Sequence, residues 1–257
     1  ESNVEFKSDT ALITDSYLSD LNVFIMTEVY TQPNALSAGE VSALTDYVLS
    51  GGCLIMISDT LHSPNNTPYH NGFDGSNAAN QILAVLDPGA SVATTDDDEA
   101  PGDPNDGKLG LSGIESATAG NIVGGLSSAV LSGPFGTLTG GDVFGASWHN
   151  ALTAGANSQI IGTRDGEFDD LGILMEIPMG ALGPGSGGVL VAGDLLFFDG
   201  FIPPGGVPGY QNEHNALLFQ NFIGACAVPE PGTWLLLTIG LVTSLGARRR
   251  RHKVASN

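Results

Sequence analysis

Hydrophobic residues along the chain gather in short continuous runs, separated by blocks in which they recur with helical spacing. Such runs are typical of strands, and runs without polar positions are typical of strands covered on both faces. They lie at 21–26, 53–58, 158–163, 172–177 and 188–193. Asp165-Gly166 is a turn signal, so we expect the third and fourth runs to pair as a hairpin.

Three helices are predicted around these strands. Ser37 and Glu40 have the spacing of a capping box, and Gly51-Gly52 ends the helix that follows. Its apolar face consists of Val41, Leu44, Tyr47 and Val48. Ser76 caps a second helix, whose apolar positions Ala79, Ile82, Leu83 and Leu86 keep the same periodicity. Asn215 caps a last helix, which we expect to bury Leu218, Phe219, Phe222 and Ile223.

The order strand, helix, strand, helix predicts an α/β fold with a mainly parallel sheet flanked by helices. Residues 87–157 are less regular and rich in Gly, Ser, Thr and Asp. A β-sandwich, common among exported Gly-rich proteins, is the rival fold, and the two capped helices count against it. The strand, capped helix, Gly-Gly and apolar strand ending at Ser58-Asp59 resemble the class I glutamine amidotransferase-like, flavodoxin-like fold over about residues 10–226.

The catalysis of that family is not expected here. It needs a cysteine on an elbow between strand and helix, activated by a His-x-Glu pair, but Cys53 opens a strand and the sequence has no His-x-Glu. The Gly-x-Ser-x-Gly elbow of α/β-hydrolases is also absent from the sequence. Cys53 and Cys226 are the only cysteines, and we expect buried free thiols rather than a disulfide.

The C-terminal tail resembles the PEP-CTERM sorting signal. Val228, Pro229, Glu230 and Pro231 lie in a linker at 227–233, before an apolar stretch at 234–247. Four arginines open the basic tail at 248–257, namely Arg248, Arg249, Arg250 and Arg251. The resemblance implies processing by an exosortase in a bacterium that makes exopolysaccharide. By the positive-inside rule the arginines stay cytoplasmic, so the apolar stretch would be a transmembrane helix with the domain at 1–226 outside the inner membrane.

Charge agrees with an exported protein. The 227 residues before the tail carry 27 acidic side chains and only Lys7, Lys108 and Arg164 as basic ones, a formal charge of −24. Such a field repels nucleic acid and attracts divalent cations. The chain begins without Met or a signal peptide, so we expect a mature form or fragment in which an upstream strand is missing.

Three carboxylates follow apolar strands, and they are the candidate ligand crevice. In open α/β sheets, ligands bind beyond the carboxyl ends of the strands, where Glu28, Asp59 and Asp194 would lie. Together they could hold a cation or the hydroxyl groups of a sugar. The alternative is that they are helix caps and solvated turn residues.

Two further segments have candidate chemistry. The acidic loop offers Asp96, Asp98, Asp103 and Asn105 as weak calcium ligands, against a simple solvated loop. Trp148-His149-Asn150 is a candidate sugar-stacking patch, against a half-buried aromatic beside a turn.

The sequence thus favours a non-catalytic structural or binding protein of the envelope or extracellular matrix, with exosortase, the inner membrane and exopolysaccharide as partners, no nucleic acid, and no cofactor except a candidate Ca²⁺. An envelope hydrolase acting on carbohydrate or peptide through the strand-end carboxylates is the alternative.

Overall fold

The computed structural model describes residues 12–26, 36–58, 76–93, 110–114, 126, 128–138, 143–146, 150–164, 171–193 and 213–227. The chain divides into two units, residues 1–226 and 227–257. The predicted crevice carboxylates, the acidic loop and the tail beyond Ala227 lie outside the described residues.

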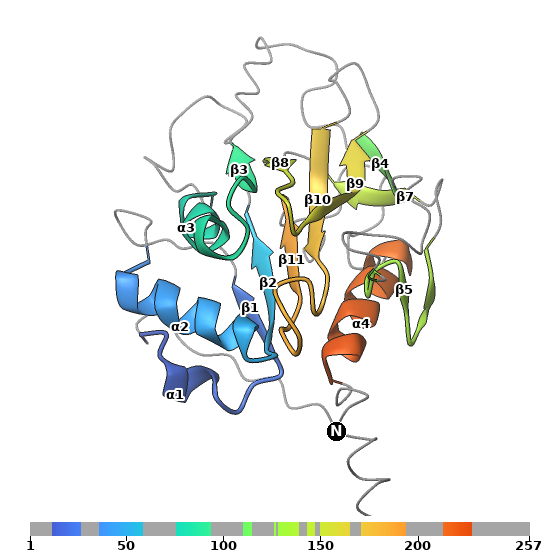
Figure 1. Ribbon diagram of the computed structural model, residues 1–257. Helices are drawn as coiled ribbons and strands as arrows, with labels where there is room; N and C mark the ends of the chain where they lie inside the picture. Colours follow the sequence, from blue (N-terminus) through green and yellow to red (C-terminus); the bar gives the residue numbers. More distant parts are fainter. Residues whose placement is uncertain are drawn as a thin grey trace, which may run out of the picture. The chain divides into compact units, whose positions relative to one another are not determined.

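The described strands form a nine-stranded mixed sheet (Figure 1). Its main path follows the order β1 (Val23–Met26), β2 (Cys53–Ile57), β11 (Val189–Ala192), β10 (Leu171–Ile177), β9 (Gln159–Arg164), β4 (Gly110–Ile114) and β7 (Val143–Ala146). Beside this path, β8 (Ala151–Thr153) pairs with β10 and with β3 (Ser91–Ala93). A separate two-stranded ribbon consists of β5 (Ser132–Gly133) and β6 (Gly136–Thr137).

Only part of this sheet is parallel. β1, β2 and β11 run parallel, whereas β10 pairs antiparallel with both β11 and β9, and β4 pairs antiparallel with β9 and β7. The predicted pairing of β9 with β10 is therefore confirmed, but the prediction of a mainly parallel sheet is wrong. The reason is that β9, β10 and β11 succeed one another in the chain and pair directly, with no helix described between them.

The first helices form where their sequence signals predict them. α1 (Asp15–Leu18) precedes β1, and α2 (Ala38–Leu49) starts at Ser37 with both hydrogen bonds of the capping box. Gly51, at φ +106°, takes the left-handed conformation that ends α2. α3 begins at Ser76 itself and ends at Leu86.

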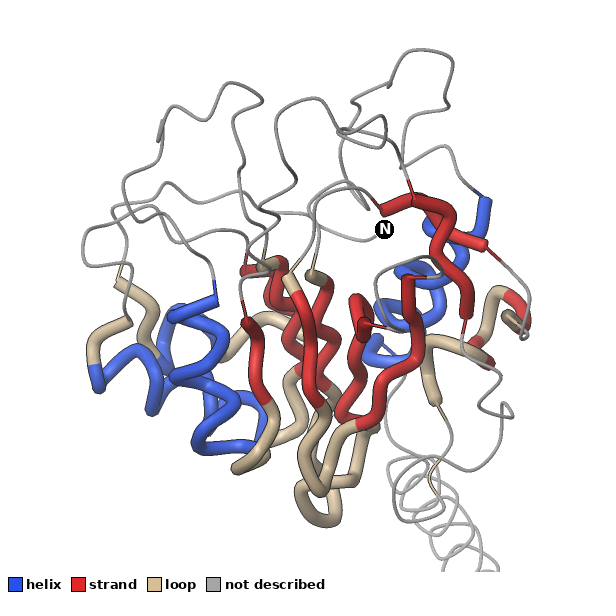
Figure 2. Tube along the Cα trace, turned by 90° about the horizontal axis from the view of Figure 1, so that it is seen from above, coloured by secondary structure: helices blue, strands red, loops and turns tan. Residues whose placement is uncertain are grey.

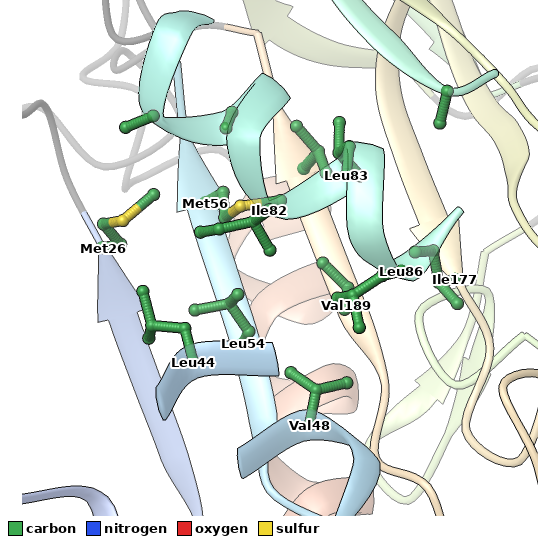
Figure 3. Close-up of a cluster of buried hydrophobic side chains, with 14 of the residues drawn as sticks. Met26, Leu44, Val48, Leu54, Met56, Ile82, Leu83, Leu86, Ile177 and Val189 are labelled. Carbon is green, nitrogen blue, oxygen red and sulfur yellow. The ribbon is translucent and has the colours of Figure 1, made fainter. Parts of the chain in front are cut away.

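These three helices pack on one face of the sheet, as Figure 2 shows from above. Side chains of β2 alternate between the faces, so Leu54 and Met56 meet α2 and α3 while Cys53, Ile55 and Ile57 point to the other face. Leu44 and Val48 from α2 and Ile82 and Leu83 from α3 are fully buried against them (Figure 3). The helix and strand pattern of this face confirms the α/β fold, and the β-sandwich is wrong.

The opposite face is covered by α4 (Glu213–Ala227) and by the segment 128–138, which contains β5 and β6. α4 starts two residues before Asn215, which is therefore inside the helix and does not cap it. Leu218, Phe219 and Phe222 are buried as predicted, but Ile223 is 38% exposed because it lies off the face that meets the sheet. None of the described helices is long and apolar enough to cross a membrane.

A disulfide bond joins the sheet to the helix α4. Cys53, the first residue of β2, is bonded to Cys226 near the end of α4, with their Cα atoms 6.0 Å apart. The expectation of free thiols is wrong. β2 and α4 are 173 residues apart in sequence, and only the packing of α4 across the sheet brings the two sulfur atoms together.

Candidate ligand site at the carboxyl edge of the parallel strands

The parallel strands end side by side, at the edge where the sequence predicts a ligand crevice. Met26 of β1 lies opposite Met56 of β2, and Ile57 of β2 lies opposite Ala192 of β11. The strands that lead into Glu28, Asp59 and Asp194 therefore end at the same edge of the sheet. The three carboxylates lie outside the described residues, so their convergence stays a prediction.

Three described residues form a buried polar cluster at this edge. Ser58 follows β2, Gly193 follows β11, and Asn150 immediately precedes β8; Ser58 and Asn150 are fully buried. The Asn150 side chain donates from Nδ2 to the Oγ atom of Ser58 at 2.9 Å and to its carbonyl oxygen at 3.3 Å. The backbone N–H of Asn150 donates to the carbonyl oxygen of Gly193 at 2.8 Å.

Close packing fixes this cluster. A side chain at Gly193 would collide with the carbonyl oxygen of Asn150, so only glycine allows the two backbones to approach this closely. The Ser58 N–H donates to the Ala192 carbonyl, and the Gly193 N–H donates to the Ile173 carbonyl. Hydrogen bonds among β2, β11 and β10 therefore fix Ser58 and Gly193, the two residues that bind Asn150.

One atom of the cluster has no partner. The Oδ1 atom of Asn150 is buried and accepts no hydrogen bond. Buried polar atoms are normally paired, so this carbonyl-type oxygen can accept a hydrogen bond or coordinate a cation. Asn150 is thus a buried residue of the sheet edge and not part of an exposed sugar-stacking patch; Trp148 and His149 lie outside the described residues.

Little in the sequence points to this role for Asn150. The residue precedes a three-residue strand inside the Gly-rich stretch that looks irregular, and nothing in its neighbourhood distinguishes it from a turn asparagine. Its partners Ser58 and Gly193 are 92 and 43 positions away, so only the pairing of β2, β11 and β8 with their neighbours reveals the cluster.

A buried carboxyl group away from this edge, that of Glu176, finds its hydrogen-bond partners within the protein. Glu176 on β10 accepts hydrogen bonds from the hydroxyl of Ser128 and from the backbone N–H groups of Ala129 and Val130. Burial raises the pKa of Glu176 to about 7, although these hydrogen bonds oppose the shift. Its partners lie in the segment packed under α4, so Glu176 is a structural group of that face.

Asp87 is also buried and also structural. Its carboxylate accepts hydrogen bonds from the Ser158 hydroxyl and from the backbone N–H of Asn157, at 2.9 Å. These contacts join the end of α3 to the turn before β9. Among the described residues, no group of three or more His, Cys, Asp or Glu side chains is placed to hold a metal ion.

Comparison with known proteins identifies the tail. Residues 227–251 match the PEP-CTERM protein-sorting motif, which confirms the resemblance seen in the sequence. A comparison with curated proteins found no match.

Among solved structures, the chain is similar to the N-terminal domain of mmIFT52, with a TM-score of 0.55, 14% identity, and coverage of 86% of this chain and 83% of that one. A cytoplasmic protein from Salmonella typhimurium LT2 gives a TM-score of 0.48 at 16% identity, covering 84% of this chain and 76% of that one. A protein from Bacteroides uniformis described as ThuA-like gives a TM-score of 0.43 at 12% identity, covering 87% of this chain and 77% of that one.

These superpositions are informative to different degrees. The match to the mmIFT52 domain supports the α/β fold and nothing more, because the identity is low; the other two are too loose to carry an argument. The sorting motif is specific: it implies an exported protein that an exosortase sorts, with a C-terminal membrane anchor before processing.

Proposed function

We propose that this protein is a non-catalytic binding or structural protein of the envelope or extracellular matrix in a bacterium that makes exopolysaccharide. The observation that carries the proposal is the position of the sorting motif, which begins at residue 227, directly after the disulfide-bonded Cys226. Every described strand and helix, apart from the last residue of α4, precedes the motif. Processing within the motif would therefore separate the disulfide-bonded domain from the basic tail.

The domain itself we assign to the class I glutamine amidotransferase-like, flavodoxin-like group, without its catalysis. The parallel trio β1, β2 and β11, with α2 connecting β1 to β2, supports this assignment. The disulfide supports the lack of thiol chemistry, because Cys53 is bonded to Cys226 and its sulfur is not a free nucleophile.

The surface charge suggests what the domain meets outside the cell. A formal charge of −24 before the tail disfavours anionic partners and favours divalent cations or cationic groups on a polymer. The strand-end carboxylates Glu28, Asp59 and Asp194 remain the proposed ligand crevice, with the Asp96, Asp98, Asp103 and Asn105 loop as a weaker cation candidate.

An envelope hydrolase is the second candidate. The unpartnered oxygen of Asn150 favours it, because a polar atom left free at the carboxyl edge of a sheet is a feature of substrate sites. A hydrolase would use Asp59 and Asp194 as acid and base. In that case Asp59→Asn should abolish the release of reducing ends or amines from an extracted exopolysaccharide or peptidoglycan, whereas the binding protein would release neither.

Sorting is tested in a host with the matching exosortase. Replacing Pro229, Glu230 and Pro231 by Ala should leave the uncleaved chain in the inner membrane, measured by fractionation and the mass of the product. Pro203→Ala, Pro204→Ala is the matched control, because it removes two prolines outside the motif and should be processed normally. Release of the motif variant at the wild-type level would contradict exosortase sorting.

A further inference from the structure

The helix α4 and the hairpin beside it are nearly free of charge in an otherwise acidic domain (Figure 1). The segment 128–138 contains no charged residue, and α4 has none after its first two residues, Glu213 and His214. The 227 residues before the tail carry a formal charge of −24. An apolar partner can therefore approach these two segments without desolvating a charged side chain of either one.

Two apolar side chains are exposed where the hairpin meets α4. Phe135 is 60% exposed at the tip of the hairpin of β5 and β6, and Ile223 on α4 is 38% exposed. The Phe135 ring lies over Gly224, since a Cβ atom added to Gly224 would be only 2.5 Å from its Cε2 atom. Phe135 thus covers the residue next to Ile223, and we call this surface the Phe135–Ile223 patch.

Hydrogen bonds and the disulfide hold the patch in place. The Phe135 N–H donates to Asn221 Oδ1 at 3.0 Å, and Asn221 Nδ2 donates to the Gly136 carbonyl at 3.1 Å. Cys226, three residues after Ile223, is bonded to Cys53 on the sheet. The hairpin tip is therefore fixed to α4 while its aromatic ring stays exposed. Exposed apolar surface of this kind marks a site of contact with a protein or a membrane.

The tail leaves the domain beside this patch. α4 ends at Ala227, and six residues separate it from Trp234, the first residue of the apolar stretch within the sorting motif. A fully extended chain of this length spans at most about 25 Å. Because the motif implies a membrane anchor before processing, the end of α4 stays close to the bilayer. A short tether gives an effective concentration on the order of millimolar, at which even a small apolar patch can bind.

We propose that the Phe135–Ile223 patch docks on the surface of the bilayer that holds the anchor, with the Phe135 ring inserted between headgroups and acyl chains. Such binding scales with the apolar area buried, which is small here, so docking depends on the tether and ends when processing removes the tail. The inference goes beyond the proposed function in the matrix, because it requires only the anchor.

A second copy of the chain is the other partner to consider. Stable interfaces bury about 800 Å² on each partner, whereas one aromatic side chain contributes about 150 to 250 Å². Two domains with a formal charge of −24 each would also repel one another. The observations therefore favour the bilayer, because the tether brings it to the patch without a separate association step.

The experiment compares nitroxide labels introduced by Phe135→Cys and by Val85→Cys in the full chain, reconstituted in phosphatidylcholine vesicles. Val85 is the matched control, because it is 56% exposed and lies on α3, on the other face of the sheet. Both native cysteines are in the disulfide, so only the added one is labelled. Paramagnetic resonance measures how often each label collides with O₂ and with a water-soluble nickel chelate.

The ratio of O₂ to nickel collisions should be at least about threefold higher at position 135 than at 85, because O₂ concentrates in the acyl region that the docked ring enters. Equal ratios would overturn the proposal. Infrequent collisions with both reagents at position 135 would also overturn it and would indicate a second copy covering the patch.

A label at Pro134→Cys leaves Phe135 available for substitution. Phe135→Ser should then lower the ratio at least about threefold, whereas Val85→Ser should leave it unchanged; the same ratio in both variants would overturn the proposal. Flotation of the vesicles tests the anchor separately. A chain that does not float with them refutes the anchor and the docking together, whereas an aqueous label on a floating chain refutes the docking alone.

Discussion

The two faces of the sheet are held by different kinds of interaction. On the α2 and α3 face, the helices pack on the sheet mainly through apolar side chains, with a capping box at the start of α2 and hydrogen bonds from Gln81 and Asp87 to more distant segments. On the α4 face, segments from the start, middle and end of the domain meet, and a disulfide and two buried polar side chains join them.

The difference follows from how each face is built. α2 and α3 are amphipathic helices that bury one face against β2, so hydrophobic burial is the main interaction on their side of the sheet. The segment 128–138 has only two-residue strands and cannot satisfy its backbone by regular pairing. Glu176 and Asn221 supply the missing partners, and Cys226 fixes the helix that carries Asn221.

The largest expected effect comes from removing the disulfide. Replacing Cys53 and Cys226 by Ala should lower the free energy of unfolding by about 5 kcal/mol, because the bond closes a very long loop in the unfolded chain. Denaturant titration of the oxidised wild type, the reduced wild type and the variant measures this. The bond also tethers α4 to β2 in the folded state, so amide exchange through local opening should accelerate more in α4 than in α2. Equal acceleration in both helices would contradict the division between the faces.

The Asn221 side chain should be the next most important. Its Oδ1 accepts from the Phe135 N–H at 3.0 Å, and its Nδ2 donates to the Val130 and Gly136 carbonyls at 3.0 and 3.1 Å. Asn221→Ala leaves all three backbone groups without these bonds and should destabilise the protein by about 3 to 5 kcal/mol.

Gln81 on α3 provides the matched control for Asn221. It makes two hydrogen bonds to the backbone of Leu36 at a partly buried position. Gln81→Ala should therefore cost about 1 to 2 kcal/mol by the same titration. A loss of stability in Gln81→Ala as large as that in Asn221→Ala, or larger, would mean that side-chain hydrogen bonds matter on the α2 and α3 face at least as much as on the α4 face.

The buried Glu176, on the α4 face, should make the free energy of unfolding depend on pH. Its pKa is raised from 4.5 to about 7, so the folded state binds more protons than the unfolded state between these values. Its stabilising contribution is full below about pH 4.5 and is lost as pH rises to about 7, a change on the order of 3 kcal/mol.

Glu176→Gln isolates this contribution from the other acidic groups. The variant keeps an acceptor for the Ala129 N–H but does not titrate. Its free energy of unfolding relative to that of the wild type should therefore be higher at pH 7 than at pH 4.5. Denaturant titrations of both proteins across this range provide the measurement. A difference between the two proteins that is constant with pH would contradict the raised pKa.

The smallest effect should come from the cap of α2. Ser37→Ala removes the acceptor for the Glu40 N–H and should cost about 1 kcal/mol. Ser42→Ala on the same helix is the control; its exposed hydroxyl bonds only to Asp46, so the change should stay within about 0.5 kcal/mol. A loss above about 2 kcal/mol at Ser37 would show that this face, too, depends on single polar contacts.

Local signals predicted one face of the molecule well. The capping box at Ser37, the apolar periodicity of α2 and α3 and the continuous run of β2 all concern neighbours within a few residues, and each is present in the structure. The hairpin of β9 and β10 was predictable for the same reason. The glycine-rich strand β4 and the three-residue strand β8 were not predictable, because neither has the side-chain pattern on which such a prediction depends.

The sequence by itself determined the export signal, the acidic charge and the helices and strands with strong local patterns, because each is encoded in contiguous residues. Only the tertiary structure decided the antiparallel pairing of β4 with β9, the Cys53–Cys226 bond, the burial of Glu176 and the contact of Asn150 with Ser58 and Gly193. Each of these joins segments that are far apart in the chain. Their pairing depends on how the strands are ordered, and residue spacing alone does not specify that order.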